Sequence, residues 1–298
     1  MLFDRVQLGE VNRCRNVTLS AAGKGANVAR VLHTLGAPTI LLSFCGGEAG
    51  KLWLNDLKRA GITVEIVRTR STTRICQTLI DRSTGEITEL VREAPLPTRT
   101  EWATLLRRFE AMLGRARLVV IAGALMPGAK DTVYRDLARL ARSHSVPVLI
   151  DSQKTALMKM LPCHPLIAKL NVHELESTLG RSLRSEKQIV TGARRLIQRG
   201  AQHVVVTHGA QGAWLVLPDR VWRFKSPRIR ALNPIGSGDA ATAGIAYGIL
   251  KGKDIAEGMR LGMACGAANV LTLTPGDVDL RMVRKLTCKV SARTFTTA

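Results

Sequence analysis

Short apolar runs alternate with amphipathic segments along most of this sequence, and the alternation limits the folds open to it. Apolar runs predict buried strands, and apolar residues at helical spacing predict the helices between them. We expect strands at residues 39–44, 118–122, 146–150, 166–170 and 204–207. We expect helices at residues 26–35, 51–60, 100–113, 131–143, 172–179, 186–199, 238–251 and 256–271. Strand–helix units in series predict one α/β domain over residues 1–298, built on a doubly wound, mostly parallel sheet flanked by helices.

One stretch departs from this alternation, because its apolar runs are joined by polar turns rather than by helices. These runs are residues 62–67, 75–81 and 87–91. Runs joined by short turns indicate antiparallel hairpins. An upstream segment has similar spacing of Val and Leu, so we expect it to pair with this insertion. The prediction is a small antiparallel β lid formed by about residues 5–20 and 62–92, on an α/β core of residues 21–61 and 93–298.

The excess of Lys and Arg over Asp and Glu bears on which molecules the protein can bind. A formal net charge of +21 suits a protein that binds nucleic acid or phosphorylated molecules. The 44 Lys and Arg residues are spread along the whole chain, without zinc-ligand spacing or a basic segment interleaved with aromatic residues. We therefore expect a solvated basic surface and no nucleic-acid partner. The basic balance also suits an enzyme that handles phosphorylated substrates, although it does not require one.

Cysteine usage and apolar run lengths indicate where the protein works. None of the six cysteines forms a CxxC pair, which is typical of reduced thiols. The first five residues, Met-Leu-Phe-Asp-Arg, do not begin a signal peptide. No apolar run approaches the roughly 18 residues that a membrane span requires. The sequence predicts a cytoplasmic protein without a membrane partner.

Residues 236–239, Gly-Ser-Gly-Asp, lead from a loop into an Ala-rich helix. Glycines let successive backbone N–H groups point the same way, and a helix N-terminus adds partial positive charge. Such a turn can hold the negative charge of a phosphoryl group during transfer, with Asp239 placed to accept a proton from the attacking hydroxyl. The alternative is a tight turn in which Asp239 merely caps the helix.

Asn171 and Glu174 lie one turn apart at the start of another predicted helix, directly after an apolar run. An amide and a carboxylate there could hold Mg²⁺ as hard oxygen ligands, directly or through water. The alternative is an ordinary N-cap with a capping-box carboxylate. Both interpretations stay open at this point.

A third candidate is the glycine-rich start of the first predicted helix, Gly23-Lys24-Gly25-Ala26-Asn27. It is not a P-loop, because Lys24 is followed by Gly25 rather than by Ser or Thr. A GxGxxG of the dinucleotide type does not follow any predicted strand, which disfavours NAD chemistry. The glycines permit a ligand to approach the backbone, and Asn27 offers a two-sided hydrogen-bonding group.

In this order, the three motifs resemble those of the ribokinase-like carbohydrate kinases, also called the PfkB family. The likeness runs over nearly the whole chain and is nearest to the phosphosugar branch, which includes 1-phosphofructokinase and tagatose-6-phosphate kinase. It implies the ribokinase-like fold and an enzyme that uses ATP and Mg²⁺. The implied reaction transfers the γ-phosphoryl group to a hydroxyl of fructose 1-phosphate, fructose 6-phosphate or tagatose 6-phosphate. It also leads us to expect a homodimer formed through the lid.

The resemblance implies roles for particular residues, grouped here by ligand. Asp239 would be the base, beside an anion hole made by the amides of Gly236, Ser237 and Gly238. The nucleotide and metal residues would be Asn171, Glu174, Thr207, Gly209, Gly212 and Asn269, with Mg²⁺ at the first two. The sugar residues would be Asp4, Gly23, Lys24 and Asn27, with Arg74 on the existing phosphate. A guanidinium suits that task because it gives a planar, bidentate, permanently charged contact.

The chain departs from the family pattern at several positions. Ala22 replaces a glycine of the pair expected to hinge the lid, and Ala122 and Ala124 replace serines near the sugar site. Relatives form a first central strand ahead of the position of Asp4, so we expect a sheet with one strand fewer unless the chain starts further upstream. Two alternatives therefore stay open: an unphosphorylated sugar or nucleoside as acceptor, and a non-catalytic binding protein descended from a kinase.

Overall fold

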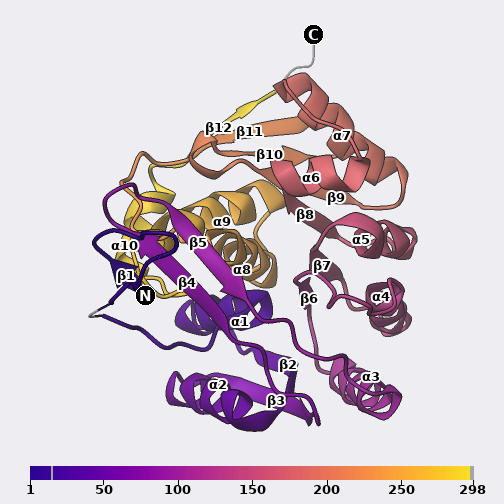
Figure 1. Cartoon of the computed structure of the whole chain (residues 1–298). Coiled ribbons are helices and arrows are strands. Elements are labelled where there is room, and N and C mark those ends of the chain that lie inside the picture. The colour runs from indigo at the N-terminus through magenta and orange to yellow at the C-terminus, as the bar shows by residue number, and fades with distance from the viewer. Residues whose placement is uncertain (15, 296–298) are drawn as a thin grey trace.

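The computed structural model describes residues 1–14 and 16–295 and shows a central seven-stranded sheet between layers of helices (Figure 1). The strand order is β12-β11-β10-β9-β8-β7-β6. The parallel strands are β6 (Val119–Ala122), β7 (Val148–Asp151), β8 (Ile167–Asn171) and β9 (His203–Thr207). The sheet continues antiparallel with β10 (Ala213–Val216), β11 (Val221–Lys225) and β12 (Ser291–Thr294). The predicted mostly parallel α/β sheet is therefore confirmed.

Alternate side chains of the central strands enter two different cores, because successive residues of a strand point to opposite faces. Val204 and Val206 belong to one core and Val205 to the other, and all three are fully buried. The first face is covered by α3 (Arg99–Leu113), α4 (Val133–Ser143), α5 (Lys154–Met160) with the 3-10 turn η1 (Leu161–Cys163), α6 (Val172–Leu179) and α7 (Glu186–Gln198). The second is covered by α1 (Lys24–Thr34), α8 (Ser237–Leu250), α9 (Ile255–Asn269) and α10 (Leu280–Thr287). Within the described residues, no helix is long and apolar enough to cross a bilayer.

A strand–helix–strand unit forms a small sheet of its own. β2 (Ile40–Cys45) and β3 (Thr63–Arg68) pair in parallel, joined by α2 (Gly47–Arg59), and they stay separate from the seven-stranded sheet. The prediction that residues 62–67 belong to an antiparallel insertion is therefore wrong. A helix of 13 residues is long enough to bring the chain back beside β2 in the same direction, whereas a hairpin turn would reverse it.

The rest of the expected insertion forms a three-stranded sheet. β4 (Cys76–Asp81) and β5 (Ile87–Val91) make an antiparallel hairpin, and β1 (Leu2–Phe3) runs parallel to β4. Of residues 5–14 and 16–20, only Asn16 forms a β-bridge, so the strand expected there is absent. The reason is burial: Leu8 and Leu19 are 96% and 84% exposed, so the alternating pattern has no core to cover.

The close packing of α8 against α9 fixes the start of α8. A Cβ added at Gly248 would lie 2.5 Å from the Cα of Gly258, and one at Gly262 would lie 2.7 Å from the carbonyl oxygen of Ala241. Neither helix can therefore accept a side chain at these contacts without moving apart. The packing sets the position of Asp239, in the first turn of α8, relative to Asn269 at the end of α9.

Candidate active site

Three parallel strands end at the same edge of the sheet, where polar residues gather. β7 ends at Asp151, β8 at Asn171 and β9 at Thr207. This carboxyl edge is the place where open α/β sheets bind ligands. Side chains from the first turn of α1 and the second turn of α8 reach the end of β7 through hydrogen bonds, so three distant parts of the chain contribute to one cluster.

The turn before α8 leads directly into the helix that carries Asp239. Gly236 is the N-cap of α8 with a φ of 81°, and a Cβ there would lie 2.9 Å from the Cβ of Pro275. Only glycine fits that conformation and space. No side chain caps the helix, and the N–H groups of a first turn lack intrahelical partners. The Ser237 N–H donates to the carbonyl of Pro234 at 3.2 Å, within the turn itself.

Asp239 is held in the first turn of α8 and is 6% exposed. The Asn27 amide donates to its Oδ2 at 2.7 Å, so the carboxylate bonds to α1 and does not cap its own helix. Burial raises the pKa of Asp239 from 3.8 to about 6, and the negative charge of Asp151 adds to this effect. The Asn27 hydrogen bond and the positive charges of Lys24 and Lys169 oppose this rise. A carboxyl group with this pKa is mostly ionised at neutral pH and can accept a proton.

Lys24 joins two carboxylates that come from different elements. Its Nζ lies 3.0 Å from Asp151 Oδ1 and 3.1 Å from Glu174 Oε1. Burial disfavours the ammonium, but the two carboxylates outweigh burial and raise the pKa of Lys24 above its ordinary value. Lys24 is therefore a permanent cation at the point where the two carboxylates converge.

Asp151 is the centre of the cluster, and the sequence motifs did not reveal it. It is 1% exposed, and its Oδ2 accepts hydrogen bonds from Lys169 Nζ and Thr242 Oγ1, each at 2.7 Å. Burial opposes the charge, yet Lys169 and Lys24 lower the pKa of Asp151 to about 2. Two features of the sequence could have identified Asp151 and Lys169 as candidate site residues. Asp151 directly follows an apolar run, as Asn171 does, and Lys169 is the one charged residue inside the next run.

Asn171 and Glu174 form a capping box at the start of α6. Asn171 Oδ1 accepts from the Glu174 N–H at 2.8 Å, and Glu174 Oε2 accepts from the Asn171 N–H at 2.8 Å. The capping alternative is therefore present in the structure. It occupies the amide oxygen of Asn171 but leaves Glu174 Oε1 facing Lys24.

The segment after β9 is a tight turn beside Asn171, since Asn171 and Thr207 are partners in the sheet register. The turn contains the short 3-10 turn η2 (Gly209–Gln211) and is closed by a hydrogen bond from the His208 N–H to the carbonyl of Gly212 at 2.7 Å. A Cβ at Gly212 would lie 2.1 Å from the carbonyl oxygen of Phe224, so this close approach requires glycine. Thr207, Gly209 and Gly212 thus lie at the same sheet edge as the cluster.

Comparison with known proteins decides the family. Residues 1–278 match the sequence profile of the pfkB family carbohydrate kinases. This chain belongs to the PfkB family. As a member, it is a phosphotransferase that acts on a sugar hydroxyl.

Solved structures agree with this PfkB assignment. A possible 1-phosphofructokinase from Thermotoga maritima has a TM-score of 0.91 and 26% identity, over 99% of this chain and 95% of that one. Phosphofructokinase-2 from Escherichia coli in complex with fructose-6-phosphate has a TM-score of 0.87 and 24% identity, over 97% and 93%. Ribokinase from Arabidopsis thaliana complexed with ribose and ATP has a TM-score of 0.77 and 20% identity, over 96% and 94%. The last two similarities show the ribokinase-like fold.

Some residues that the PfkB resemblance assigned to the sugar lie apart from the cluster. Asp4 has a side chain that is 96% exposed and accepts from Arg82 at 3.4 Å. Arg74 pairs with Glu93 at 3.0 Å, and both side chains are about half exposed. Neither contacts the residues around Asp239, whereas Lys24 and Asn27 do.

The structure also describes Asn269, which differs from expectation, and Gly23. Asn269 is 1% exposed, and both polar atoms of its amide bond to the backbone of residues 235 and 276, so the side chain offers no free group to a nucleotide. Gly23 is the N-cap of α1 with a φ of 115°, exposed beside Lys24.

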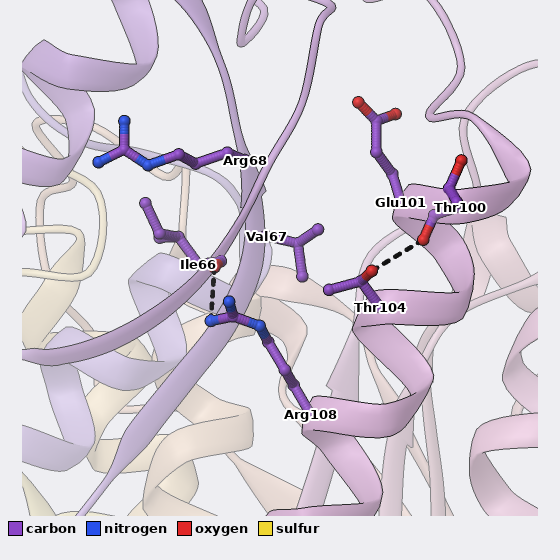
Figure 2. Close-up of a pocket in the computed structure, with 7 residues that line it drawn as sticks. All are labelled: Ile66, Val67, Arg68, Thr100, Glu101, Thr104 and Arg108. Atoms are coloured by element: carbon purple, nitrogen blue, oxygen red, sulfur yellow. Dashed lines mark hydrogen bonds between the residues drawn. The ribbon is translucent and has the colours of Figure 1, made fainter.

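A separate pocket of about 420 Å³ lies between β3 and α3 (Figure 2). None of the predicted site residues lines it. Its polar side chains serve the local structure: Arg108 pairs with Glu65 and donates to the carbonyl of Ile66, and Glu101 completes the cap of α3. The edge of the sheet around Asp151 is therefore the candidate active site of this kinase.

Proposed function

We propose that this kinase transfers the γ-phosphoryl group of ATP to a hydroxyl of a phosphorylated ketohexose, with Asp239 as the base. The acceptor would be fructose 1-phosphate, fructose 6-phosphate or tagatose 6-phosphate. The observation that supports this most is the buried carboxylate of Asp239, held by Asn27 at the uncapped start of α8. The T. maritima relative with a 1-phosphofructokinase description supports the class of acceptor.

Proton transfer would take place at Asp239. The acceptor hydroxyl would donate its proton to the carboxylate while its oxygen attacks the γ-phosphorus. The pKa of about 6 leaves the carboxylate mostly ionised at neutral pH and basic enough to take a proton. The Asn27 amide, 2.7 Å from Oδ2, would hold the carboxylate in a fixed orientation, with the other oxygen free of that bond.

Positive charge for the transferred group would come from two sources. The amides of Gly236, Ser237 and Gly238 and the N-terminus of α8 would form the anion hole. For that role the Ser237 N–H must exchange its bond to Pro234 for one to the phosphoryl group. Lys24, a permanent cation, would supply the second source. Phosphoryl transfer needs such positioning and charge stabilisation more than covalent chemistry.

ATP and Mg²⁺ are part of the proposal, and the donor set fits the metal. Asp151 Oδ1 and Glu174 Oε1 converge on one cation, the Lys24 ammonium, so two carboxylate oxygens are already gathered at one point. Carboxylate oxygens are ligands that Mg²⁺ accepts. Among the described residues no group of three or more His, Cys, Asp or Glu is arranged to hold a metal. When bound, Mg²⁺ would neutralise charge on the ATP phosphates.

Asn171 would contribute less to the metal than the sequence suggested, because its Oδ1 caps α6. Thr207, Gly209 and Gly212 would form the nucleotide side, since they lie at the same sheet edge and present a glycine turn without bulky side chains. Asn269 would act from beneath the anion hole rather than on the nucleotide.

A second acceptor class is an unphosphorylated sugar or nucleoside, and the position of Arg74 favours it. In the structure Arg74 pairs with Glu93 rather than facing the cluster. In the phosphosugar proposal the Arg74 guanidinium leaves Glu93 to bind the substrate phosphate. Arg74→Ala should then raise the KM for a phosphosugar at least about tenfold, the loss expected for one charge-assisted contact. Glu93→Gln serves as the matched control, because it frees Arg74 without removing it.

The experiment that tests the function is a screen of sugars and phosphosugars with MgATP, in which ADP release is coupled to a spectrophotometric reaction. We expect turnover with at least one phosphorylated ketohexose. Turnover only with unphosphorylated acceptors would select the second class. Phosphorylation of none of them, by an enzyme that still binds ATP in calorimetry, would instead identify the non-catalytic binding protein.

We also propose that the three-stranded sheet and residues 5–20 act as a lid and as the interface of a homodimer. Exposed apolar side chains gather on this part of the chain, namely Leu8, Val11, Val17, Leu19, Ile75, Leu90 and Val91. Such exposure in one region is typical of an interaction surface. Sedimentation velocity of the wild type and of Leu8→Lys/Leu19→Lys tests the dimer, which the double variant should dissociate.

A further inference from the structure

Two buried asparagines hold the turn that precedes Asp239. Asn233 lies in the loop before the turn, and Asn269 is the last residue of α9; they are 3% and 1% exposed. In both side chains the amide oxygen accepts from a backbone N–H and the amide nitrogen donates to a backbone carbonyl. Every polar atom of both amides therefore has a backbone partner within the protein.

Both asparagines bond to the same residue of the turn, Ile235. The Ile235 N–H donates to Asn233 Oδ1 at 3.0 Å, and Asn269 Nδ2 donates to the Ile235 carbonyl at 3.0 Å. The carbonyl of Ile235 and the N–H of Gly236 belong to one planar peptide group and point in opposite directions within that plane. The hydrogen bond to the Ile235 carbonyl therefore also orients the Gly236 N–H. That N–H is one of the three amides of the proposed anion hole.

The other end of each asparagine reaches the loop after α9. Asn233 Nδ2 donates to the Leu273 carbonyl at 2.9 Å, and Asn269 Oδ1 accepts from the Gly276 N–H at 2.7 Å. The turn and this loop are thus joined by two parallel side-chain bridges.

The bridged loop also touches the residue that holds the base. A Cβ added at Gly276 would lie 2.7 Å from the Cα of Asn27, so the loop and α1 are in close contact. Asn27 in turn donates to Asp239. A displacement of the loop would therefore disturb both the anion-hole amides and the hydrogen bond to the base.

We propose that Asn233 and Asn269 are positioning residues for phosphoryl transfer. They hold Ile235 so that the Gly236 N–H points at the transferred group, and they hold the loop that supports Asn27. They touch neither substrate, because their polar atoms are buried and satisfied. This inference rests on the proposed function of the turn. The structural claim within it, that the two asparagines hold the turn in place, can be tested without measuring activity.

The kinetic test uses Asn269→Leu and Asn233→Leu, which keep the number and branching of the side-chain heavy atoms and remove the hydrogen bonds. We expect kcat to fall roughly 10- to 100-fold, the range for a misplaced anion-hole donor, while KM for sugar and the Kd for ATP change less than about twofold. The double variant should lose little more than either single variant, because both act through Ile235. Val190→Ala, at a buried position of α7, is the control for general destabilisation and should keep the wild-type kcat.

The structural test is hydrogen exchange, which does not depend on activity. In the wild type the N–H groups of Ile235 and Gly276 should exchange slowly although both lie in loops, and residues 235–238 should exchange faster in Asn269→Leu. Rapid exchange of these two N–H groups in the wild type overturns the inference, and so does a kcat loss that Val190→Ala reproduces. A wild type inactive on every sugar would defeat the proposed function, and exchange would still decide whether the asparagines hold the turn.

Discussion

Asp239→Asn should stabilise the folded protein at neutral pH while it abolishes phosphoryl transfer. Burial, helped by the charge of Asp151, raises the pKa of Asp239 from 3.8 to about 6 in the folded state. In the unfolded chain the same carboxyl titrates near its ordinary value. Between these two values the folded protein binds a proton that the unfolded chain releases. Folding therefore becomes less favourable as pH rises through this window.

The magnitude follows from the size of the shift. A rise of about 2 pKa units corresponds to about 3 kcal/mol, at roughly 1.4 kcal/mol per unit. The penalty is absent below the unfolded pKa, grows between about pH 4 and pH 6, and is complete at about pH 7. An uncharged Asn escapes it, so Asp239→Asn should gain about 3 kcal/mol over the wild type at about pH 7 and almost nothing at about pH 4.

The assay is urea unfolding of both proteins across this pH range, followed by tryptophan fluorescence, with turnover measured on the same samples. Asp254→Asn is the matched control, because Asp254 is an exposed N-cap of α9 and Asn caps a helix equally well. It should change stability by less than about 0.5 kcal/mol at every pH. A stability gain that is equal at acid and neutral pH would refute the buried-charge reasoning. Retained turnover would refute Asp239 as the base.

Four further measurements test the cluster and its support. The kcat/KM of the wild type should fall about tenfold per pH unit below about pH 6, as the base becomes protonated; a flat profile down to about pH 5 would contradict this assignment. Lys24→Met should bind Mn²⁺ more tightly in calorimetry, because two converging carboxylates lose their internal cation; unchanged affinity would mean that these oxygens do not take a metal. Thr242→Val should cost about 1–2 kcal/mol in urea unfolding, since Asp151 loses a buried hydrogen bond, whereas Thr242→Ser should cost less. Gly262→Ala should cost about 1–3 kcal/mol by forcing α8 from α9, and a neutral effect would refute the close packing.

The parts of the fold that could be predicted from sequence are those encoded by neighbouring residues. The positions of β2 to β9 and of eight helices, α1 to α4 and α6 to α9, follow from apolar spacing, and the capping box of Asn171 and Glu174 lies within one helical turn. The pairing of β3 could not be deduced in this way, since its apolar pattern suits either neighbour. Its direction was decided by α2, whose length returns the chain in parallel.

The contacts within the candidate site could not be predicted from local sequence patterns, because they join residues far apart in the chain. Lys24 and Asp151 are 127 positions apart, and Asn27 and Asp239 are 212 apart. No residue near Asp151 in the sequence predicts that the Lys24 ammonium, from α1, will form an ion pair with its carboxylate. The family resemblance selected Lys24, Asn27 and Asp239, but it did not show that Asp151 joins Lys24 to Lys169 and Thr242. Only the folded arrangement places its two oxygens between Lys24 on one side and Lys169 and Thr242 on the other.

Glu174 shows why a structural role and a ligand role need not be alternatives. Its Oε2 accepts from the Asn171 N–H, and its Oε1 faces Lys24 at 3.1 Å. The first bond restricts the rotation of the carboxylate, so the second oxygen is aimed at the cluster before any ligand arrives. A capping box therefore supplies what a binding site requires, a charged group whose orientation is already fixed. The start of α8, at residues 236–238, is different, because no side chain caps it. In this cluster the capped helix orients a carboxylate, and the uncapped one leaves room for an anion.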